Sequence, residues 1–236
     1  MSVIALVPAA GRGERLGAAV PKALVEVRGE ALLLHAARGL LASGRVQHVV
    51  IAAPPDQVDV VAEVLRPLGA AHVIAGGAER TDSVRLALDE AGRLVPDADV
   101  VLVHDAARAF TPPEVIGAVV DEVRGGAPAV IPVLPVADTV KRIDDAGCVE
   151  STVDRSRLRA VQTPQGFAVD VLRRAHDAAG EDGATDDAGL VERLGIQVRT
   201  VPGHAHALKI TTTFDLAIAE SVLTADPAPV PGGNPR

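Results

Sequence analysis

The sequence predicts an α/β fold: a Rossmann-like three-layer sandwich with a mostly parallel central sheet and a projecting β-hairpin arm. Short β-branched runs alternate with helical segments along the chain, as in parallel sheets covered by helices. Apolar residues make up 48% of the 236 residues, but only three residues are aromatic, so Ala, Val, Leu and Ile must build the core. Such a composition suits strands that are buried on both faces.

Each expected element follows this alternation. Strands are expected over residues 3–7, 48–52, 71–74, 99–103, 129–134, 160–163, 197–201 and 207–210. Helices are expected over residues 31–41, 57–65, 83–94, 113–123, 169–177, 187–194 and 214–223. Pro113 lies near a helix start, where its missing N–H is harmless.

Residues 138–156 interrupt the pattern with two β-favouring runs around a turn at residues 144–147. We expect them to form a hairpin arm. An exposed arm with few apolar residues needs a partner to order it, so a homodimer is expected. The arm is too short for a domain, and residues 1–224 are expected to form a single domain. Residues 225–236 are rich in Pro and Gly and are expected to be a disordered tail.

Charge and cysteine content exclude several classes of protein. The net charge is −8 and the pI is about 5.3, which argues against a nucleic-acid partner. Cys148 is the only cysteine, and the seven histidines form no zinc-binding pair, so neither a disulfide within the chain nor a zinc site is expected. The start lacks the features of a signal peptide, and no apolar run reaches the ~20 residues that span a bilayer. We expect a cytoplasmic protein with no membrane contact.

A glycine-rich loop with basic residues follows the first apolar run. Gly11 and Gly13 lie in this loop, with Arg15 next and Lys22 after Pro21. Backbone N–H groups in such a loop can approach phosphate oxygens, and the cations can neutralise phosphate charge. The spacing is neither that of a Walker loop nor that of a dinucleotide fingerprint. The pattern indicates a phosphate site, and the alternative is a solvated turn.

Polar residues also follow two other expected strands. His104, Asp105 and Arg108 come after residues 99–103, at a strand end where α/β sheets bind ligands. Asp105 can bind a hydroxyl or Mg²⁺, or can cap the next helix. Gly77 and Ser83 follow residues 71–74, where Asp82 or Ser83 can be an N-cap.

Four further residues are less distinctive. Lys209 lies in an apolar run, and because a buried unpaired lysine is costly, it is expected to face an anion. Taken alone, Thr139 and Arg155 at the two ends of the arm are ordinary polar residues. Thr185 can be an N-cap.

The glycine-rich loop matches the pattern x-A-A-G-x-G-x-R-(M/L)-G followed by P-K. This pattern opens the sugar nucleotidyltransferases, and from Val3 to Val222 the chain resembles one group of them, the 2-C-methyl-D-erythritol 4-phosphate cytidylyltransferases. The resemblance implies the nucleotidyltransferase type of sandwich and cytidylyl transfer from CTP to 2-C-methyl-D-erythritol 4-phosphate with release of pyrophosphate. It also implies Mg²⁺ or another divalent cation, for which no protein ligand is assigned.

The resemblance assigns roles to residues that match the motifs. The implied catalytic residues are Arg15, Lys22, Arg155 and Lys209. The implied nucleotide-binding residues are Pro8, Ala9, Ala10, Gly11, Gly13, Gly77, Ser83, Asp105 and Ala106. The implied substrate-binding residues are Asp105, Arg108, Thr139, Arg155, Thr185 and Lys209. Thr139 and Arg155 are expected to serve a neighbouring subunit, and the segment Gln162-Thr163-Pro164-Gln165 is interpreted as structural.

The chain departs from the family pattern at several places. Ala109 replaces a frequent proline, Ala78 replaces a polar residue, and Ala207 and Thr212-Thr213 change the surroundings of Lys209. Three alternatives stay open. The acceptor can be another polyol phosphate, such as ribitol 5-phosphate. A regulatory nucleotide-binding protein is disfavoured because Arg15 and Lys22 are both retained. An NAD-dependent oxidoreductase is disfavoured by the misplaced third glycine and the lack of an acidic residue after residues 48–52.

Overall fold

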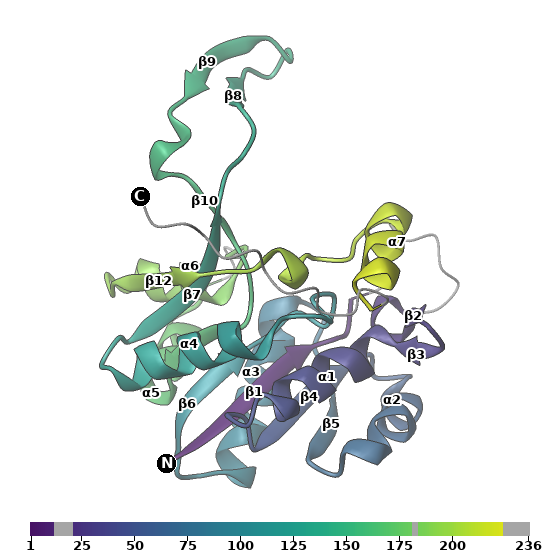
Figure 1. The fold of residues 1–236 in the computed structure, drawn as a ribbon. Coiled ribbons are helices and arrows are strands. Elements are labelled where there is room, and N and C mark those ends of the chain that lie inside the picture. The colour runs from purple at the N-terminus through teal and green to yellow at the C-terminus, as the bar shows by residue number, and fades with distance from the viewer. Residues whose placement is uncertain (12–20, 181–183, 224–236) are drawn as a thin grey trace, which may run out of the picture.

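The computed structural model describes residues 1–11, 21–180 and 184–223, apart from the side chains of Lys22 and Val222. Within these ranges, eight strands form one sheet in the order β10-β7-β11-β6-β1-β4-β5, with β12 paired to β7 (Figure 1). The strands are β1 (Ser2–Pro8), β4 (His48–Ala53), β5 (Ala71–Ala75), β6 (Ala98–Val103), β7 (Ala129–Pro135), β10 (Arg159–Val161), β11 (Gln165–Ala168) and β12 (Val198–Pro202). The predicted mostly parallel sheet is confirmed, because only β10 and β11 run antiparallel to their neighbours in the described sheet.

Helices cover both faces of this sheet, which explains why its central strands are apolar throughout. The helices are α1 (Leu32–Ala42), α2 (Val58–Leu65), α3 (Arg80–Leu94), α4 (Pro113–Arg124), α5 (Val169–Asp177), α6 (Asp187–Arg193) and α7 (Thr213–Val222). In β1, Val3 and Ala5 pack with α1, α2 and α4, whereas Ile4 and Leu6 pack with α3, α5 and α6. Because side chains alternate along a strand, this two-sided burial requires an unbroken apolar run.

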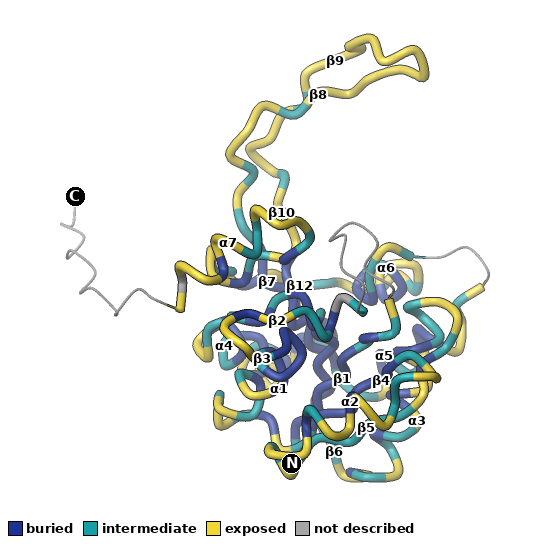
Figure 2. The backbone as a smooth tube through the Cα atoms, turned by 90° about the vertical axis from the view of Figure 1, so that its right-hand side faces the viewer, coloured by how far each residue is buried: buried dark blue, intermediate teal, exposed yellow. Residues whose placement is uncertain are grey.

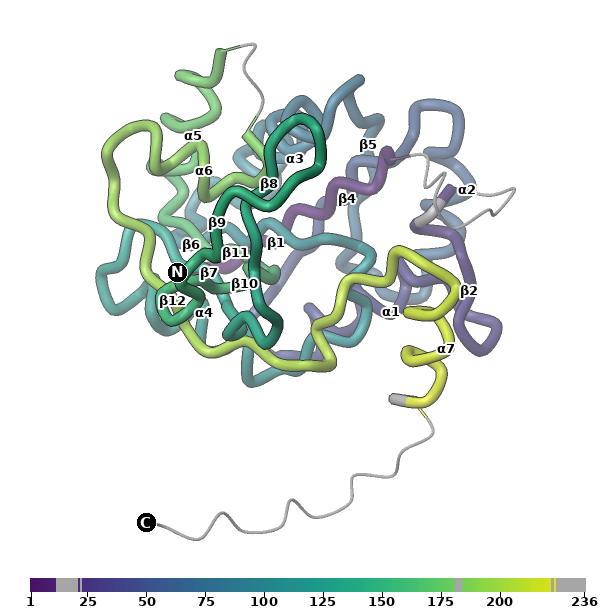
Figure 3. Tube along the Cα trace, turned by 90° about the horizontal axis from the view of Figure 1, so that it is seen from above, coloured from purple at the N-terminus to yellow at the C-terminus, as the bar shows by residue number. Residues whose placement is uncertain are grey.

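Shorter elements complete the fold. The strands β2 (Glu26–Val27) and β3 (Glu30–Ala31) form a small hairpin, beside which α7 packs (Figure 3). The 3-10 turns are η2 (Lys22–Leu24), η3 (Arg66–Leu68), η4 (Arg155–Arg157) and η5 (Ala205–Ala207). No helix in the described part of the chain has the length and apolar character needed to cross a membrane.

The expected arm is present. The strands β8 (Val140–Ile143) and β9 (Val149–Val153) pair antiparallel and project from the body, with most of their residues exposed (Figures 1 and 2). The Asp144 side chain accepts hydrogen bonds from the N–H groups of Ala146 and Cys148, and Gly147 adopts a φ of 80°, so the turn lies where the sequence predicts it.

Two strand predictions are wrong in part or in full. The strand expected over residues 160–163 ends at Val161 as β10, and a separate strand, β11, begins after Pro164, which has no N–H to donate to a ladder. Residues 207–210 form no strand: Ala207 ends η5, and Ile210 N–H donates to Ala107 C=O (2.8 Å) in a loop. An apolar run becomes a strand only where a sheet edge is free to pair with it.

The predicted start of one helix is wrong, and the residues named as possible N-caps are not the N-caps in the structure. Helix α3 begins at Arg80 rather than Ser83, because Glu79 is its N-cap and the Asp82 carboxylate accepts from the Glu79 N–H (3.3 Å). The N-cap of α6 is Asp186 rather than Thr185, since the Asp186 side chain accepts from Gly189 N–H (2.9 Å). The predicted tail, residues 225–236, lies outside the described residues.

Candidate active site

A cleft of about 330 Å³ opens at the carboxyl ends of β1, β5 and β6. The chain runs from β1 to β4 and β5 on one side and returns to β6 on the other, so the cleft lies at the point where the strand order reverses. Ligands bind at such points in open α/β sheets. The lining residues are Pro8, Ala9, Ala10, Gly11, Ala23, Gly77, Ala78, Glu79, Arg80, Ser83, Asp105, Ala106, Ala107 and Lys209.

Every predicted nucleotide-binding residue that the structure describes lines this cleft. Gly13 and Arg15 lie outside the described residues, as does the side chain of Lys22. The backbone at Lys22 begins η2, and the next residue, Ala23, lines the cleft. The chain therefore returns to the cleft immediately after the glycine-rich loop.

One wall of the cleft is a close approach between the start of the glycine-rich loop and α3. The Gly77 N–H donates to Ser83 Oγ (3.1 Å), and this hydroxyl donates to Glu79 C=O (3.1 Å). A Cβ on Gly76 would lie 2.9 Å from both Ala10 Cβ and Ser83 Oγ, which is too close for carbon. Any residue other than glycine at position 76 would force one of these neighbours to move, so this part of the wall consists of backbone and small side chains.

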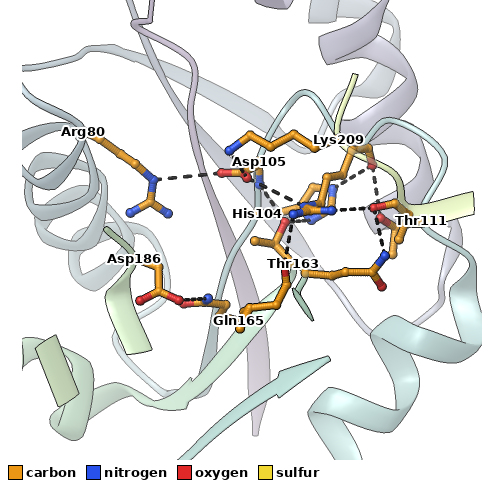
Figure 4. A network of polar contacts seen from close by, with 12 residues as sticks. Arg80, His104, Asp105, Thr111, Thr163, Gln165, Asp186 and Lys209 are labelled. Carbon is orange, nitrogen blue, oxygen red and sulfur yellow. Dashed lines mark hydrogen bonds and ion pairs between the residues drawn. The ribbon is translucent and has the colours of Figure 1, made fainter. Parts of the chain in front are cut away.

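The Asp105 carboxylate at the cleft lies among three cations, two of which, Arg80 and Lys209, are labelled in Figure 4. Asp105 Oδ2 lies 2.9 Å from Lys209 Nζ and 3.8 Å from Arg108 Nε, and Asp105 Oδ1 lies 3.9 Å from Arg80 Nε. Burial by itself would raise the pKa of Asp105, but the three cations outweigh it and hold that pKa below its usual value. Two of these cations, Arg80 and Lys209, line the cleft itself, and cations of this kind bind phosphate groups.

The anion that Lys209 is expected to face is therefore the Asp105 carboxylate of the same chain. The strand expected around Lys209 does not form, and the Lys209 side chain is 47% exposed in the loop after η5, whereas the expectation that it faces an anion is confirmed by Asp105. An exposed ammonium can change partners without the cost of burying an unpaired charge. Lys209 is therefore available to a phosphate that enters the cleft.

Buried polar groups fix the loop that carries Asp105. The Asp105 N–H donates to Thr163 Oγ1 (3.0 Å), and that hydroxyl lies 3.1 Å from His104 Nδ1. His104 Nε2 lies 3.2 Å from Arg108 C=O, which can only accept, so Nε2 carries the proton and Nδ1 accepts from Thr163. Burial lowers the pKa of His104 to about 4, so the ring is neutral at pH 7.

Arg108 lies beside the cleft rather than in its lining. Its guanidinium donates to the carbonyls of Ala207 (2.7 Å) and Val161 (3.1 Å), and its side chain is 12% exposed. Arg108 thereby connects the loop after β6 to β10 and to η5, which positions Lys209. Its predicted contact with the substrate phosphate stays a prediction.

The remaining predicted substrate residues do not line the cleft of their own chain. Thr139 and Arg155 are exposed at the base of the arm, where Arg155 donates to the carbonyls of Val136 (3.0 Å) and Ala137. Thr185 precedes the N-cap of α6. Within one chain, the structure therefore brings Asp105 and Lys209 to the nucleotide-binding residues, but not Thr139, Arg155 or Thr185.

Sequence reasoning missed two residues of this site. Arg80 lines the cleft as the first residue of α3, and the late start predicted for that helix left it in a loop. Thr163 fixes both His104 and Asp105, a structural role of the kind predicted for its segment, but the sequence does not indicate these two partners. Arg80 follows soon after Gly77 in the sequence, and this short spacing could have identified Arg80 as a residue of the site. No local feature of the sequence indicates the partners of Thr163.

Comparison with known proteins agrees with this geometry. A family model described as 2-C-methyl-D-erythritol 4-phosphate cytidylyltransferase matches residues 3–225. A protein of that name from Saccharopolyspora erythraea is 73% identical over 94% of this chain and 100% of its own length, and one from Nocardia farcinica is 55% identical over 94% of each chain.

Solved structures show the same fold. The crystal structure of 2-C-methyl-D-erythritol 4-phosphate cytidylyltransferase from Thermus thermophilus has a TM-score of 0.76 and 35% identity, covering 95% of this chain and 100% of that one. A 4-diphosphocytidyl-2C-methyl-D-erythritol synthase from Anaerococcus prevotii has a TM-score of 0.81 and 28% identity, covering 95% and 99%. The chain therefore belongs to the 2-C-methyl-D-erythritol 4-phosphate cytidylyltransferase family.

Proposed function

We propose that this protein transfers a cytidylyl group from CTP to 2-C-methyl-D-erythritol 4-phosphate in the synthesis of isoprenoid precursors. A phosphate oxygen of the acceptor attacks the α-phosphorus of CTP, the bond from that phosphorus to the bridging oxygen breaks, and pyrophosphate leaves in line. The observation that carries the proposal is one cleft that unites the start of the glycine-rich loop, the Gly77–Ser83 wall and the Asp105–Lys209 pair. No general base is required, because a phosphate dianion is already a nucleophile.

The residues contribute positioning and charge rather than covalent chemistry. We assign Arg15 and Lys22 to the charge that develops on the α-phosphorus and the leaving group. Lys209, which is exposed at the cleft, is assigned to the acceptor phosphate together with Arg155 of a neighbouring subunit. Asp105, held by Thr163 through its backbone, is assigned to hydroxyls of the ligands.

Mg²⁺ is the proposed divalent cation. Among the described residues, no group of three or more His, Cys, Asp or Glu side chains could hold a metal by itself, and the carboxylates lining the cleft are those of Glu79 and Asp105. Mg²⁺ commonly binds substrate phosphates and keeps several waters, so this sparse donor set fits an ion that is held by CTP. When bound, the ion neutralises phosphate charge; we assign it no protein ligand.

We also propose a homodimer in which the arm completes the neighbouring site. An isolated two-stranded hairpin is marginal in water, and this one presents Ile143 and Val149 as cross-strand partners that are 60% and 61% exposed. A partner surface that covers this pair would stabilise the arm. Arg155 and Thr139 lie at the base of the same arm, which is consistent with their assignment to a neighbouring cleft. A single exposed cysteine suits the cytoplasm, where we place the enzyme.

The test is pyrophosphate release by the purified protein with Mg²⁺, each nucleoside triphosphate in turn, and a panel of polyol phosphates. We expect turnover with CTP and 2-C-methyl-D-erythritol 4-phosphate, and loss of turnover when a chelator removes the metal. Comparable rates with ATP, GTP and CTP would refute base selection by the Gly77–Ser83 wall. Faster turnover with ribitol 5-phosphate would reassign the acceptor but keep the reaction.

A further inference from the structure

Arg80 is held by a buried ion pair that lies behind the cleft. Arg80 Nη1 lies 2.7 Å from Asp187 Oδ2, and the other carboxylate oxygen of Asp187 lies 2.9 Å from His176 Nε2. The side chains of Asp187 and His176 are each only 1% exposed. A buried carboxylate is strongly destabilising without a partner, so Asp187 fixes the position of the Arg80 guanidinium.

The support for Asp187 is itself rigid. Asp187 is the first residue of α6, and Gln165 of β11 holds the start of this helix by accepting from Ala188 N–H (3.0 Å) and donating to Asp186 (2.7 Å). Figure 4 shows the Gln165–Asp186 contact on the side of the site where Arg80 reaches toward Asp105. The guanidinium is therefore anchored to the sheet through α6, while its side chain stays 33% exposed at the cleft.

Asp105 needs a second counter-ion if Lys209 is to bind substrate. Lys209 is its nearest cation at 2.9 Å, and a lysine that turns toward a phosphate leaves this poorly exposed carboxylate behind. Arg108 donates to two carbonyls through Nη1 and Nη2, and its Nε, which makes no hydrogen bond, lies 3.8 Å from Asp105 Oδ2, so Arg108 faces one carboxylate oxygen only. Arg80 lies 3.9 Å from the other carboxylate oxygen, and its planar fork can contact two carboxylates at once.

We propose that Arg80 is a positioning residue that compensates Asp105 while Lys209 turns from this carboxylate to the acceptor phosphate. The ion pair with Asp187 keeps Arg80 in reach, so the cleft retains a fixed cation whichever partner Lys209 has. This inference rests on the proposed function. It predicts that loss of Arg80 traps Lys209 on Asp105 and thereby weakens binding of the acceptor rather than of CTP.

The test compares Arg80→Gln with Arg85→Gln in steady-state assays of pyrophosphate release. Arg85 is the matched control, because it lies in the first turns of the same helix with its own carboxylate partner, Asp82 (3.3 Å), and is 58% exposed. We expect Arg80→Gln to raise the KM for the acceptor roughly tenfold, with the KM for CTP within about twofold of wild type. Arg85→Gln should leave both values unchanged. Equal kinetics for the two variants, or an equal rise in both KM values for Arg80→Gln, would overturn the proposal.

A double-mutant cycle with Lys209→Met tests the connection to the lysine. Because Arg80 acts through Lys209, the rise in acceptor KM caused by Lys209→Met should be smaller in the Arg80→Gln background, and additive effects would contradict the proposal. Arg80→Lys serves if Arg80→Gln does not fold: it keeps a cation for Asp187, but one ammonium cannot bridge two carboxylates, so the acceptor KM should still rise. A folded Arg80→Lys protein with the wild-type KM would overturn the proposal. An inactive wild-type protein would instead refute the proposed function.

Discussion

Replacing Gly76 by alanine should narrow the nucleotide site, because the added methyl group would press on residues that line the cleft. Gly76 follows β5, and its backbone lies against Ala10 of the glycine-rich loop and Ser83 of α3. The added methyl carbon would lie 2.9 Å from Ala10 Cβ, 2.9 Å from Ser83 Oγ and 3.2 Å from the Ala53 carbonyl oxygen. Carbon atoms normally stay about 3.5–4.0 Å apart, so at least one wall of the cleft must move by roughly half an ångström or more.

The size of the effect follows from the cost of overpacking, typically about 1–3 kcal/mol. If the whole cost fell on stability, the Tm of a chain of this length would fall by roughly 2–12 °C. If it fell on the nucleotide complex, the KM for CTP would rise between about fivefold and 150-fold. The cost is expected to divide between the two, because the atoms that must move line the cleft and also belong to the fold.

The assay measures Tm and the KM for CTP on the same preparation. Gly39→Ala is the control, because Gly39 lies inside α1 and a Cβ there meets no atom within 4 Å. This control should gain about 1 kcal/mol from helix propensity and keep its KM. The reasoning would be refuted if Gly76→Ala kept both the wild-type Tm and the wild-type KM, since Ala10 and Ser83 would then separate without cost.

Further predictions test the charges, the buried histidine and the arm. Arg15→Ala and Lys22→Ala should each lower kcat roughly 10²–10³-fold with a small change in the KM for CTP, and a variant with full kcat and weaker CTP binding would contradict the assigned role. Because burial lowers the pKa of His104 to about 4, the unfolded chain binds a proton that the folded protein does not bind between pH 6.5 and about 4. Stability therefore falls as pH falls through this window, and the Tm should drop more from pH 7 to pH 4.5 in the wild type than in His104→Gln; equal drops would show that the ring does not contribute. Mixing inactive Arg155→Ala with inactive Lys22→Ala should restore activity toward roughly a quarter of wild type once subunits exchange. The reason is that, if sites are shared between subunits, each heterodimer has one intact site. No recovery despite measured subunit exchange would assign Arg155 to the site of its own subunit.

Much of the fold could be predicted because its signals are local. The apolar run in β1 predicts a strand buried on both faces, and β1 covers Ser2–Pro8 with its interior fully buried. The predicted boundaries of α5 agree with the structure, and the predicted turn of the arm forms around Asp144. Hydrophobic runs, periodicity and turn residues depend mainly on neighbours in the chain, so they can be interpreted without tertiary contacts.

The errors concern features that need a partner from elsewhere in the fold. The expected strand at residues 207–210 has the right composition, but the N–H of Ile210 donates to the loop carbonyl of Ala107 rather than to a strand, so the segment stays a loop. Several neighbouring polar residues could cap the N–H groups at the start of α3. Glu79 and Asp82 together form the cap in the structure, so the helix begins at Arg80.

The sequence by itself determined the chemistry that follows each strand: small residues after β1 and β5, and a carboxylate with a nearby arginine after β6. It also determined the helices and most strands of the main sheet, since burial and periodicity depend on local runs of residues, although the strand expected over residues 207–210 does not form. The tertiary structure alone decided which of these groups meet. The strand order places β5, β4, β1 and β6 side by side, so their carboxyl ends share one cleft. Asp105 then lies close to Lys209 and Arg80, which come from distant segments of the chain. Charges gathered at the carboxyl ends of the strands interact through space, whatever their separation along the chain.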